Sequence, residues 1–276
     1  MTYLEFDFKV VPVILGSEIL IAELDDIGFE SFVENKDGFL AYILEQDFKE
    51  TALNELQLLS NREFKISWTS KTIEQQNWNA EWEKNFHPIR VDNECMVRAP
   101  FHKQEEVTYD IVIEPKMSFG TGHHETTHMM LQHILTYDFK GKKVLDMGCG
   151  TGILAILAEM KGATAIDAID IDNWCYLNSI ENVERNNSTN INVLEGDSSL
   201  LANKKFDVII ANINRNILLQ DIPIYEKCLN PNGLLFLSGF YKSDLPIISL
   251  KCDDYSLKFN YNLEKNSWVA AVYQKG

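Results

Sequence analysis

The part of the sequence that most constrains the fold is the segment KVLDMGCGTG at residues 143–152. Its first half is β-prone and mostly apolar, and the apolar residues 153–160 that follow are typical of a buried helix. Gly148, Gly150 and Gly152 separate the two, and glycine lets a backbone turn sharply and approach a ligand closely. A strand, a glycine turn and a helix in this order predict a nucleotide-type pocket at the free N–H groups of the helix N-terminus.

The spacing of these glycines favours one class of cofactor. It is G-x-G-x-G, whereas the dinucleotide fingerprint of an NAD-dependent oxidoreductase is G-x-G-x-x-G. Asp146 precedes the first glycine, and its carboxylate can attract the positively charged amino group of a methionine moiety. We therefore predict an S-adenosylmethionine site. Its cofactor-binding residues at the turn are Asp146, Gly148, Gly150 and Gly152.

The next predicted strand, residues 165–172, ends in further acidic residues. Asp170 lies at its carboxyl end, where ligands bind in open α/β sheets and a carboxylate can hold ribose hydroxyls. Asp170 is therefore predicted to bind the cofactor ribose, and Asp172 to cap the following helix. A purely capping role for Asp170 remains the alternative.

A fourth, nearly apolar strand over residues 206–211 is predicted to be central in a parallel sheet. It delivers Asn212 to the carboxyl edge, where the amide can accept a hydrogen bond from an attacking amine or orient the cofactor. We predict both a catalytic and a cofactor-binding role for Asn212, against the alternative of a turn-forming asparagine. Residues 196–198, Gly-Asp-Ser, give a weaker indication of an adenine contact.

The organisation of the chain predicts two domains and a linker. Residues 1–70 show the order βαββαβ, which predicts a small ferredoxin-like α+β domain. Within it we expect Ser17 to cap a helix that Gly28 ends, and a second helix over residues 48–59. Residues 71–95 are predicted to form a helical linker docked through two tryptophans, Trp78 and Trp82. Residues 96–276 alternate strand-like and helical stretches, which predicts a doubly wound Rossmann-like α/β domain.

Composition excludes some partners. The net charge of -16 argues against broad phosphate neutralisation, so no direct nucleic-acid binding is expected, and a basic protein substrate would be attracted. The charge could also serve only solubility.

The five cysteines form no C-x-x-C pair, which indicates reduced thiols. Without a signal-like start or an apolar stretch of roughly 18 residues, we expect a cytoplasmic monomer outside the membrane.

Residues 114–127, EPKMSFGTGHHETT, resemble the loop that precedes the glycine strand in the ribosomal protein L11 methyltransferase family, PrmA. Residues 77–89 resemble the linker of that family, and residues 237–239 the end of its fifth strand. The resemblance implies an N-terminal substrate-recognition domain, a helical linker and a catalytic domain that ends in an antiparallel strand. Position by position, it implies cofactor contacts at Thr127, Gly148, Asp170 and Asn212.

The resemblance also implies a reaction, the trimethylation of lysine and α-amino groups of ribosomal protein L11. For this chemistry we expect Asn212 to align the amine, Phe119 to close the site and water to take the proton. The family usually has Thr and Pro where His124 and Glu125 stand, and a small apolar pair at residues 214–215. A methyltransferase for another protein, RNA or a small molecule would share the cofactor site, as would a noncatalytic binding module.

One coincidence gives a remote alternative. Residues 124–128, HETTH, match the H-E-x-x-H signature of zinc metalloproteases. The match lies directly behind the loop at residues 119–122 rather than inside a long helix, and no obvious third ligand follows. We therefore predict no metal site, while adventitious metal binding by His124 and His128 remains open.

Overall fold

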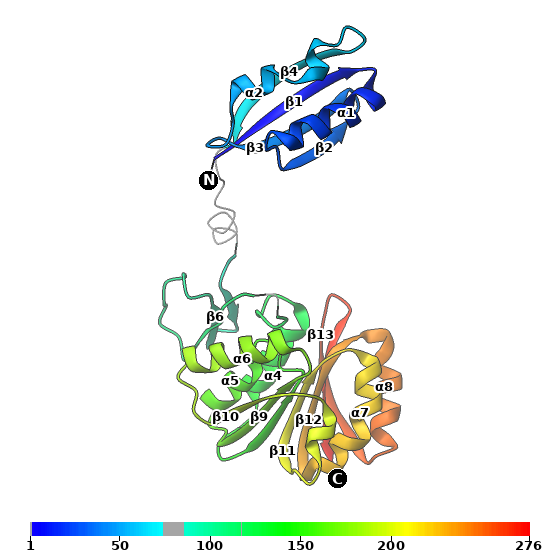
Figure 1. Ribbon diagram of the computed structural model, residues 1–276. Helices are drawn as coiled ribbons and strands as arrows, with labels where there is room; N and C mark the ends of the chain where they lie inside the picture. Colours follow the sequence, from blue (N-terminus) through cyan, green and yellow to red (C-terminus); the bar gives the residue numbers. More distant parts are fainter. Residues whose placement is uncertain (1, 74–85, 117) are drawn as a thin grey trace. The chain divides into compact units, whose positions relative to one another are not determined.

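The computed structural model describes residues 2–73, 86–116 and 118–276. The chain divides into two compact units, Met1–Lys84 and Asn85–Gly276. Figure 1 draws the first unit in blue to cyan and the second in green to red.

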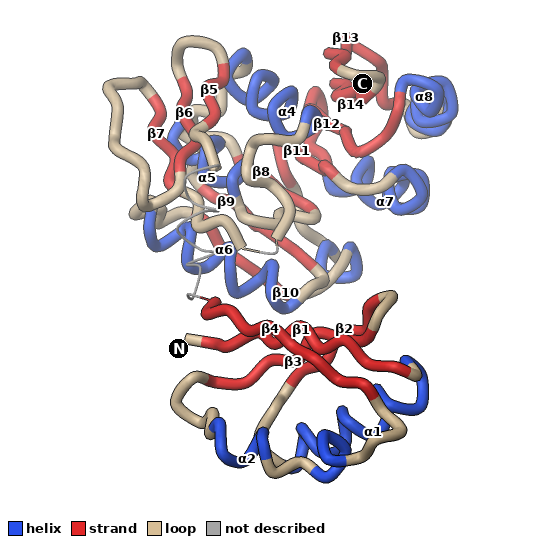
Figure 2. The backbone as a smooth tube through the Cα atoms, turned by 90° about the horizontal axis from the view of Figure 1, so that it is seen from above, coloured by secondary structure: helices blue, strands red, loops and turns tan. Residues whose placement is uncertain are grey.

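The first unit is a four-stranded antiparallel sheet with its helices on one face (Figure 2). Its elements are β1 (Tyr3–Val11), α1 (Val13–Asp26), β2 (Ser31–Asn35), β3 (Gly38–Leu44), α2 (Glu50–Asn54) and β4 (Lys65–Ile73). The strand order β2-β3-β1-β4 gives the ferredoxin-like topology that the sequence predicts. Alternate residues of β1, among them Phe6 and Phe8, are buried against Leu20, Leu24 and Leu53 of the helices.

Both helices of this unit differ from their predicted bounds. α1 begins at Val13, and Pro12 instead of Ser17 occupies the N-cap position. Proline suits a helix start because its φ is fixed and it has no N–H to leave unpaired. The predicted helix over residues 48–59 ends at Asn54, and a 3₁₀ turn follows at Gln57–Ser60. Between them Leu56 is not helical, with a ψ of 134°, and both Leu56 and Leu58 of the turn are buried in the core.

The predicted helical linker is only partly described. Trp78 and Trp82 lie outside the described residues. Its two flanks are strands: β4 keeps pairing with β1 up to Ile73, and β5 (Ile89–Val91) joins a small sheet with β6 (Cys95–Arg98) and β7 (Tyr109–Val112). The ends of the region 71–95 are therefore not helical, because their backbone groups are paired in sheets.

The second unit contains a seven-stranded sheet in the order β10-β9-β8-β11-β12-β14-β13. Its elements are α4 (Glu125–Thr136), β8 (Lys143–Met147), α5 (Ile153–Met160), β9 (Ala165–Asp170), α6 (Asn173–Arg185), β10 (Ile191–Glu195), β11 (Phe206–Asn212), α7 (Arg215–Cys228), β12 (Leu229–Tyr241), α8 (Leu245–Asp253), β13 (Leu257–Lys265) and β14 (Trp268–Lys275). The first five strands are parallel, and β14 is antiparallel to both of its neighbours. The doubly wound sheet with an antiparallel end is confirmed.

Helices cover both faces of this sheet (Figure 1). One hydrophobic core lies between the sheet and α4 and α5, and a second lies between the sheet and α7 and α8. Strand order reverses at β8 and β11, which leaves a crevice at their carboxyl ends, the usual ligand site in such sheets. Among the described residues, no helix has the length and apolar character to cross a membrane.

Candidate functional site

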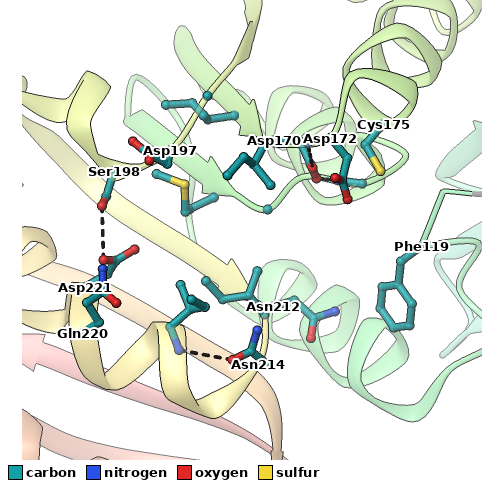
Figure 3. Close-up of a pocket in the computed structure, with 18 residues that line it drawn as sticks. Phe119, Asp170, Asp172, Cys175, Asp197, Ser198, Asn212, Asn214, Gln220 and Asp221 are labelled. Carbon is teal, nitrogen blue, oxygen red and sulfur yellow. Dashed lines mark hydrogen bonds between the residues drawn. The ribbon is translucent and has the colours of Figure 1, made fainter.

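A cavity of about 410 Å³ lies at this switch point (Figure 3). Its walls come from the loop before α4, the carboxyl ends of β8, β9 and β11, and the starts of α6 and α7. Figure 3 shows Asp170 and Asp172 on one side, Asn212 and Asn214 on another, and Phe119 across from them. Small-molecule sites typically measure about 300–1,000 Å³, so the cavity has the size of a cofactor site.

The glycine turn forms the floor of the cavity, and two of its positions require glycine. Gly148 has a φ of +70°, and a Cβ there would lie 2.1 Å from Cγ2 of Ile213. Gly150 has a φ of +57°, and a Cβ there would lie 2.2 Å from the carbonyl oxygen of Phe119. Gly152, as predicted from the sequence, stands at the start of α5, where it is the N-cap. The turn therefore exposes bare backbone to a ligand at a helix N-terminus.

The loop that contains Phe119 is fastened to this turn. The carbonyl of Phe119 accepts a hydrogen bond from the Thr151 N–H at 2.9 Å, and Thr151 Oγ1 donates to the Gly120 carbonyl at 2.6 Å. The Phe119 side chain stays 51% exposed and lines the cavity. It is therefore in position for the predicted role of closing the site.

Asp170 connects β9 to the glycine turn. Its Oδ2 accepts a hydrogen bond from Gly150 N–H at 2.8 Å, and its Oδ1 accepts one from Asp172 N–H at 3.0 Å. It is 8% exposed and lines the cavity. Each carboxylate oxygen has a further lone pair, so the side chain can still accept from ribose hydroxyls.

Asp172 occupies the N-cap position of α6, as predicted, but its side chain makes no capping hydrogen bond. The half-buried side chain lines the cavity beside Asp170 instead. Its carboxylate is therefore available to a ligand rather than used by the helix.

Asp146 is fully buried and does not itself line the cavity. Its Oδ2 accepts a hydrogen bond from Ala155 N–H at 3.1 Å, in the first turn of α5. Its Oδ1 has no hydrogen-bond partner among the described residues. Burial raises the pKa of Asp146 to about 7, and the nearby charge of Asp170 adds to the rise. A cation bound close by would stabilise the ionised form, which fits the predicted attraction of an amino group.

Asn212 ends β11 and lines the cavity, as predicted. Its Nδ2 donates to Thr127 Oγ1 at 3.4 Å, which leaves the buried Oδ1 without a partner in the described part of the chain. That oxygen can accept a hydrogen bond from an amine. Thr127 is 1% exposed and does not line the cavity, so its contact with the site runs through Asn212.

Sequence reasoning missed the wall formed by α7. Asp221 is 4% exposed, lines the cavity and accepts hydrogen bonds from Ser198 Oγ at 3.1 Å and from Tyr225 OH at 3.3 Å. Burial raises the pKa of Asp221. Asn214 also lines the cavity and caps α7 by accepting from Ile217 N–H at 3.2 Å. The cap could have been predicted, because asparagine is a preferred residue directly before the first residue of a helix. Nothing in the local sequence indicates that Asp221 belongs to the site.

The HETTH segment forms the start of the 12-residue helix α4, although the sequence placed it outside a long helix. His124 is the N-cap of α4, and its Nδ1 accepts a hydrogen bond from Thr126 N–H at 3.2 Å. Glu125 accepts one from Asn266 Nδ2 at 2.8 Å. Among the residues that the structure describes, His124 and His128 belong to no group of three potential ligands. The first histidine therefore caps the helix through its Nδ1.

Comparison with known proteins identifies the family. A family model described as "Ribosomal protein L11 methyltransferase (PrmA)" matches residues 20–276. The chain belongs to this family. It is 48% identical to the ribosomal protein L11 methyltransferase of Phocaeicola vulgatus, with 99% of each chain covered. It is 35% identical to that of Chlorobaculum parvum, with 93% of this chain and 92% of the relative covered.

A solved structure supports the same assignment for this PrmA-family chain. The ribosomal protein L11 methylase of Lactobacillus delbrueckii subsp. bulgaricus superposes with a TM-score of 0.65 at 28% identity, over 69% of this chain and all of that one (100%). A methyltransferase from Pyrococcus furiosus shares the fold, with a TM-score of 0.52 at 19% identity over 60% of this chain and 89% of the other. The predicted family and fold class are confirmed.

The chain is therefore an S-adenosylmethionine-dependent methyltransferase, and its residues fit that cofactor. The glycine turn leaves backbone without side chains at the cavity, where Cβ atoms at positions 148 and 150 would clash with neighbouring residues. The unpartnered oxygen of Asn212 lies at the cavity wall and suits a donor of the cofactor, while the buried Asp146 can act on the cofactor through its charge. The predicted cofactor is confirmed, while the role of each residue remains a prediction.

Proposed function

We propose that this protein uses S-adenosylmethionine to methylate lysine and α-amino groups of ribosomal protein L11, up to the trimethylated state. The observation that carries the proposal is the amide oxygen of Asn212, buried without a described partner at the wall of the cofactor cavity. This oxygen can accept a hydrogen bond from the substrate amine that is to be methylated, at the wall of the cavity that would hold the cofactor. The choice of L11 is supported by the names of the relatives.

Each side chain of the site has a separate part in this proposal. The cofactor, when bound, supplies a methyl group already activated on a sulfonium. The glycine turn leaves room for the cofactor at the cavity, the carboxylate of Asp170 holds its ribose, and the charge of Asp146 complements its amino group. Asn212 aligns the substrate amine, and the side chain of Phe119 closes the cavity and excludes water from it. Alignment of this kind is the main contribution of a protein to a displacement on an activated group.

The acceptor must lose a proton before it can attack. A free lysine has a pKa of about 10.4, and burial of the ammonium in a partly apolar pocket would lower it. Both oxygens of Asp170 already accept backbone hydrogen bonds, so it is a poor base. We infer that water takes the proton.

Charge and domain structure suggest how L11 is selected. With a net charge of -16, the surface attracts a basic protein and repels nucleic acid. We assign substrate recognition to the ferredoxin-like unit, residues 1–70, with residues 71–95 as the linker. We further propose that the protein acts as a monomer in the cytoplasm, where ribosomal proteins are made.

The direct test is methylation of recombinant L11. The purified protein is incubated with labelled S-adenosylmethionine and L11, and added methyl groups are located by mass spectrometry. Asp170→Ala serves as the cofactor-site control. Methyl groups on lysine or terminal amines that this variant fails to add would support the proposal. Cofactor binding without transfer to L11 would remove the substrate assignment.

A further inference from the structure

Four aromatic side chains form a continuous row beside the cavity: Phe119, His124, Trp268 and Tyr241. The Phe119 and His124 rings are 5.2 Å apart, and the His124 and Trp268 rings 4.9 Å apart, both edge to face. The Trp268 and Tyr241 rings follow at 4.0 Å. These residues, called the aromatic row below, come from the loop before α4, the start of α4, the start of β14 and the end of β12.

The aromatic row starts at the cavity that Asn212 also lines. Phe119 lines the cavity directly. His124 lies about one helical turn before Thr127, whose Oγ1 is hydrogen bonded to Asn212. On the other side, Asn212 pairs with Ser238 of β12, which continues to Tyr241. The proposed methyl-acceptor position therefore shares its cavity with Phe119, the first ring of the row.

The two ends of the row are open to solvent. Phe119 is 51% exposed and Tyr241 49% exposed, although large aromatic side chains are usually covered. Two carboxylates stand next to the row. Glu125 follows His124, and Asp244 accepts a hydrogen bond from Tyr241 N–H at 3.3 Å while it pairs with Arg215. Ring faces bordered by carboxylates suit an organic cation.

The chemistry of repeated methylation calls for such a surface. Each added methyl group removes one N–H that Asn212 could accept, so hydrogen bonding holds the amine less well after every transfer. Cation–π attraction persists, because aromatic rings bind even a quaternary ammonium, which has no N–H left. An amine kept near the cavity can be methylated again before the substrate leaves.

We propose that the aromatic row is the acceptor subsite, which holds the mono- and dimethylated amine between transfers and thereby sets the degree of methylation. This inference rests on the proposed function. In each round the amine lone pair forms an N–C bond while the S–CH₃ bond of the cofactor breaks and its electron pair stays on sulfur. The proton of the amine passes to water.

The test compares products of matched variants. Tyr241→Leu removes a half-exposed ring, and Phe259→Leu removes a ring of similar exposure, 43%, on β13 outside the row. Intact-mass spectrometry follows mono-, di- and trimethylated L11 over time. We expect Tyr241→Leu to raise the ratio of partly methylated to trimethylated product at least about tenfold, and Phe259→Leu to match the unmodified enzyme. Tyr241→Phe retains the ring and should restore the trimethylated product.

A second measurement needs no turnover. Binding of Nα-acetyl-trimethyllysine amide, with S-adenosylhomocysteine present, is measured by saturation-transfer NMR. The unmodified protein should bind this probe better than it binds Nα-acetyl-lysine amide, whose side-chain nitrogen carries no methyl group. Tyr241→Leu should bind the two probes equally, while its affinity for S-adenosylhomocysteine stays within about twofold of that of the unmodified protein. Trp268→Leu should act alike. An unchanged product ratio and unchanged probe binding in Tyr241→Leu would overturn the proposal. If L11 is not methylated by any form, the proposed function fails, whereas probe binding still decides on the aromatic row.

Discussion

Asp146 gives a quantitative prediction for cofactor binding. Burial raises its pKa to about 7, and one of its oxygens has no partner among the described residues. If its charge attracts the amino group of the cofactor, only the ionised form binds well. With a pKa near 7, about one tenth of the protein is ionised at pH 6 and about nine tenths at pH 8. The Kd of S-adenosylhomocysteine should therefore be roughly tenfold higher at pH 6 than at pH 8, about 1.4 kcal/mol.

Isothermal titration calorimetry from pH 5.5 to 8.5 measures this dependence. Repeating it in two buffers of different ionisation enthalpy counts the protons released on binding, and release should occur below pH 7. Asp146→Asn is the matched control, because an amide oxygen of the same shape can still accept from Ala155 N–H. This variant should bind weakly at every pH. A flat profile in the unmodified protein, or an equal slope in Asp146→Asn, would refute the reasoning.

The same shift has a consequence for stability without cofactor. In the unfolded chain the Asp146 carboxyl titrates at its ordinary pKa, near 4, so it loses its proton at a lower pH than in the folded protein. The folded state then binds more protons between about pH 4 and 7, and stability falls as pH rises through that window. The thermal stabilities of the unmodified protein and of Asp146→Asn should therefore diverge between about pH 4 and 7 and stay apart above pH 7, with the variant the more stable of the two.

Three shorter predictions concern the rest of the site. Gly150→Ala would place a Cβ 2.2 Å from the Phe119 carbonyl oxygen at a φ of +57°, which costs roughly 1–3 kcal/mol of strain. Calorimetry should therefore show at least tenfold weaker binding of S-adenosylhomocysteine. Thr127→Val removes the hydrogen bond to Asn212, a loss of roughly 1 kcal/mol, so kcat should fall about three- to tenfold at saturating cofactor. Equal rates would show that this hydrogen bond does not position Asn212 for the reaction. Dialysis against EDTA should leave methylation within about twofold, since His124 caps α4; a loss that zinc restores would revive the HETTH alternative.

The glycine turn could be predicted because its determinants are local. A strand, three spaced glycines and an apolar helix lie within residues 143–160, and the turn needs positive φ at positions where only glycine is unstrained. The parallel sheet followed from the alternation of strand-like and helical segments, and the carboxyl ends of its strands then placed Asp170 and Asn212 at one edge. Both line the cavity.

Helix bounds in the first unit were less predictable because the core decides them. Ser17 has a favourable N-cap side chain, yet it is buried inside α1 and its Oγ has no partner in the described residues. The leucine spacing over residues 48–59 suits one helix, but burial of Leu56 and Leu58 requires a break. Propensity is worth a few tenths of a kcal/mol at each such position, whereas burying a leucine is worth about 1.5–3 kcal/mol.

The remaining differences at the site come from contacts that span long stretches of sequence. Asp221 in the cavity wall accepts a hydrogen bond from Ser198, which is 23 residues away in the sequence, and Thr127 accepts one from Asn212, which is 85 residues away. No window of sequence contains either pair. The family resemblance named Thr127, but it could not say that this residue is buried behind Asn212 and outside the cavity lining.

That arrangement changes how Thr127 should be understood. Its hydroxyl accepts the Nδ2–H of Asn212, so the amide is held with its oxygen, and not its nitrogen, unpartnered. An amide turned the other way would present a donor, which an ammonium acceptor or a cofactor amino group could not use. We therefore infer that Thr127 positions the Asn212 amide at the cavity wall. The proposed reaction needs a hydrogen-bond acceptor at the end of β11, and the contact with Thr127 holds the oxygen of Asn212 there.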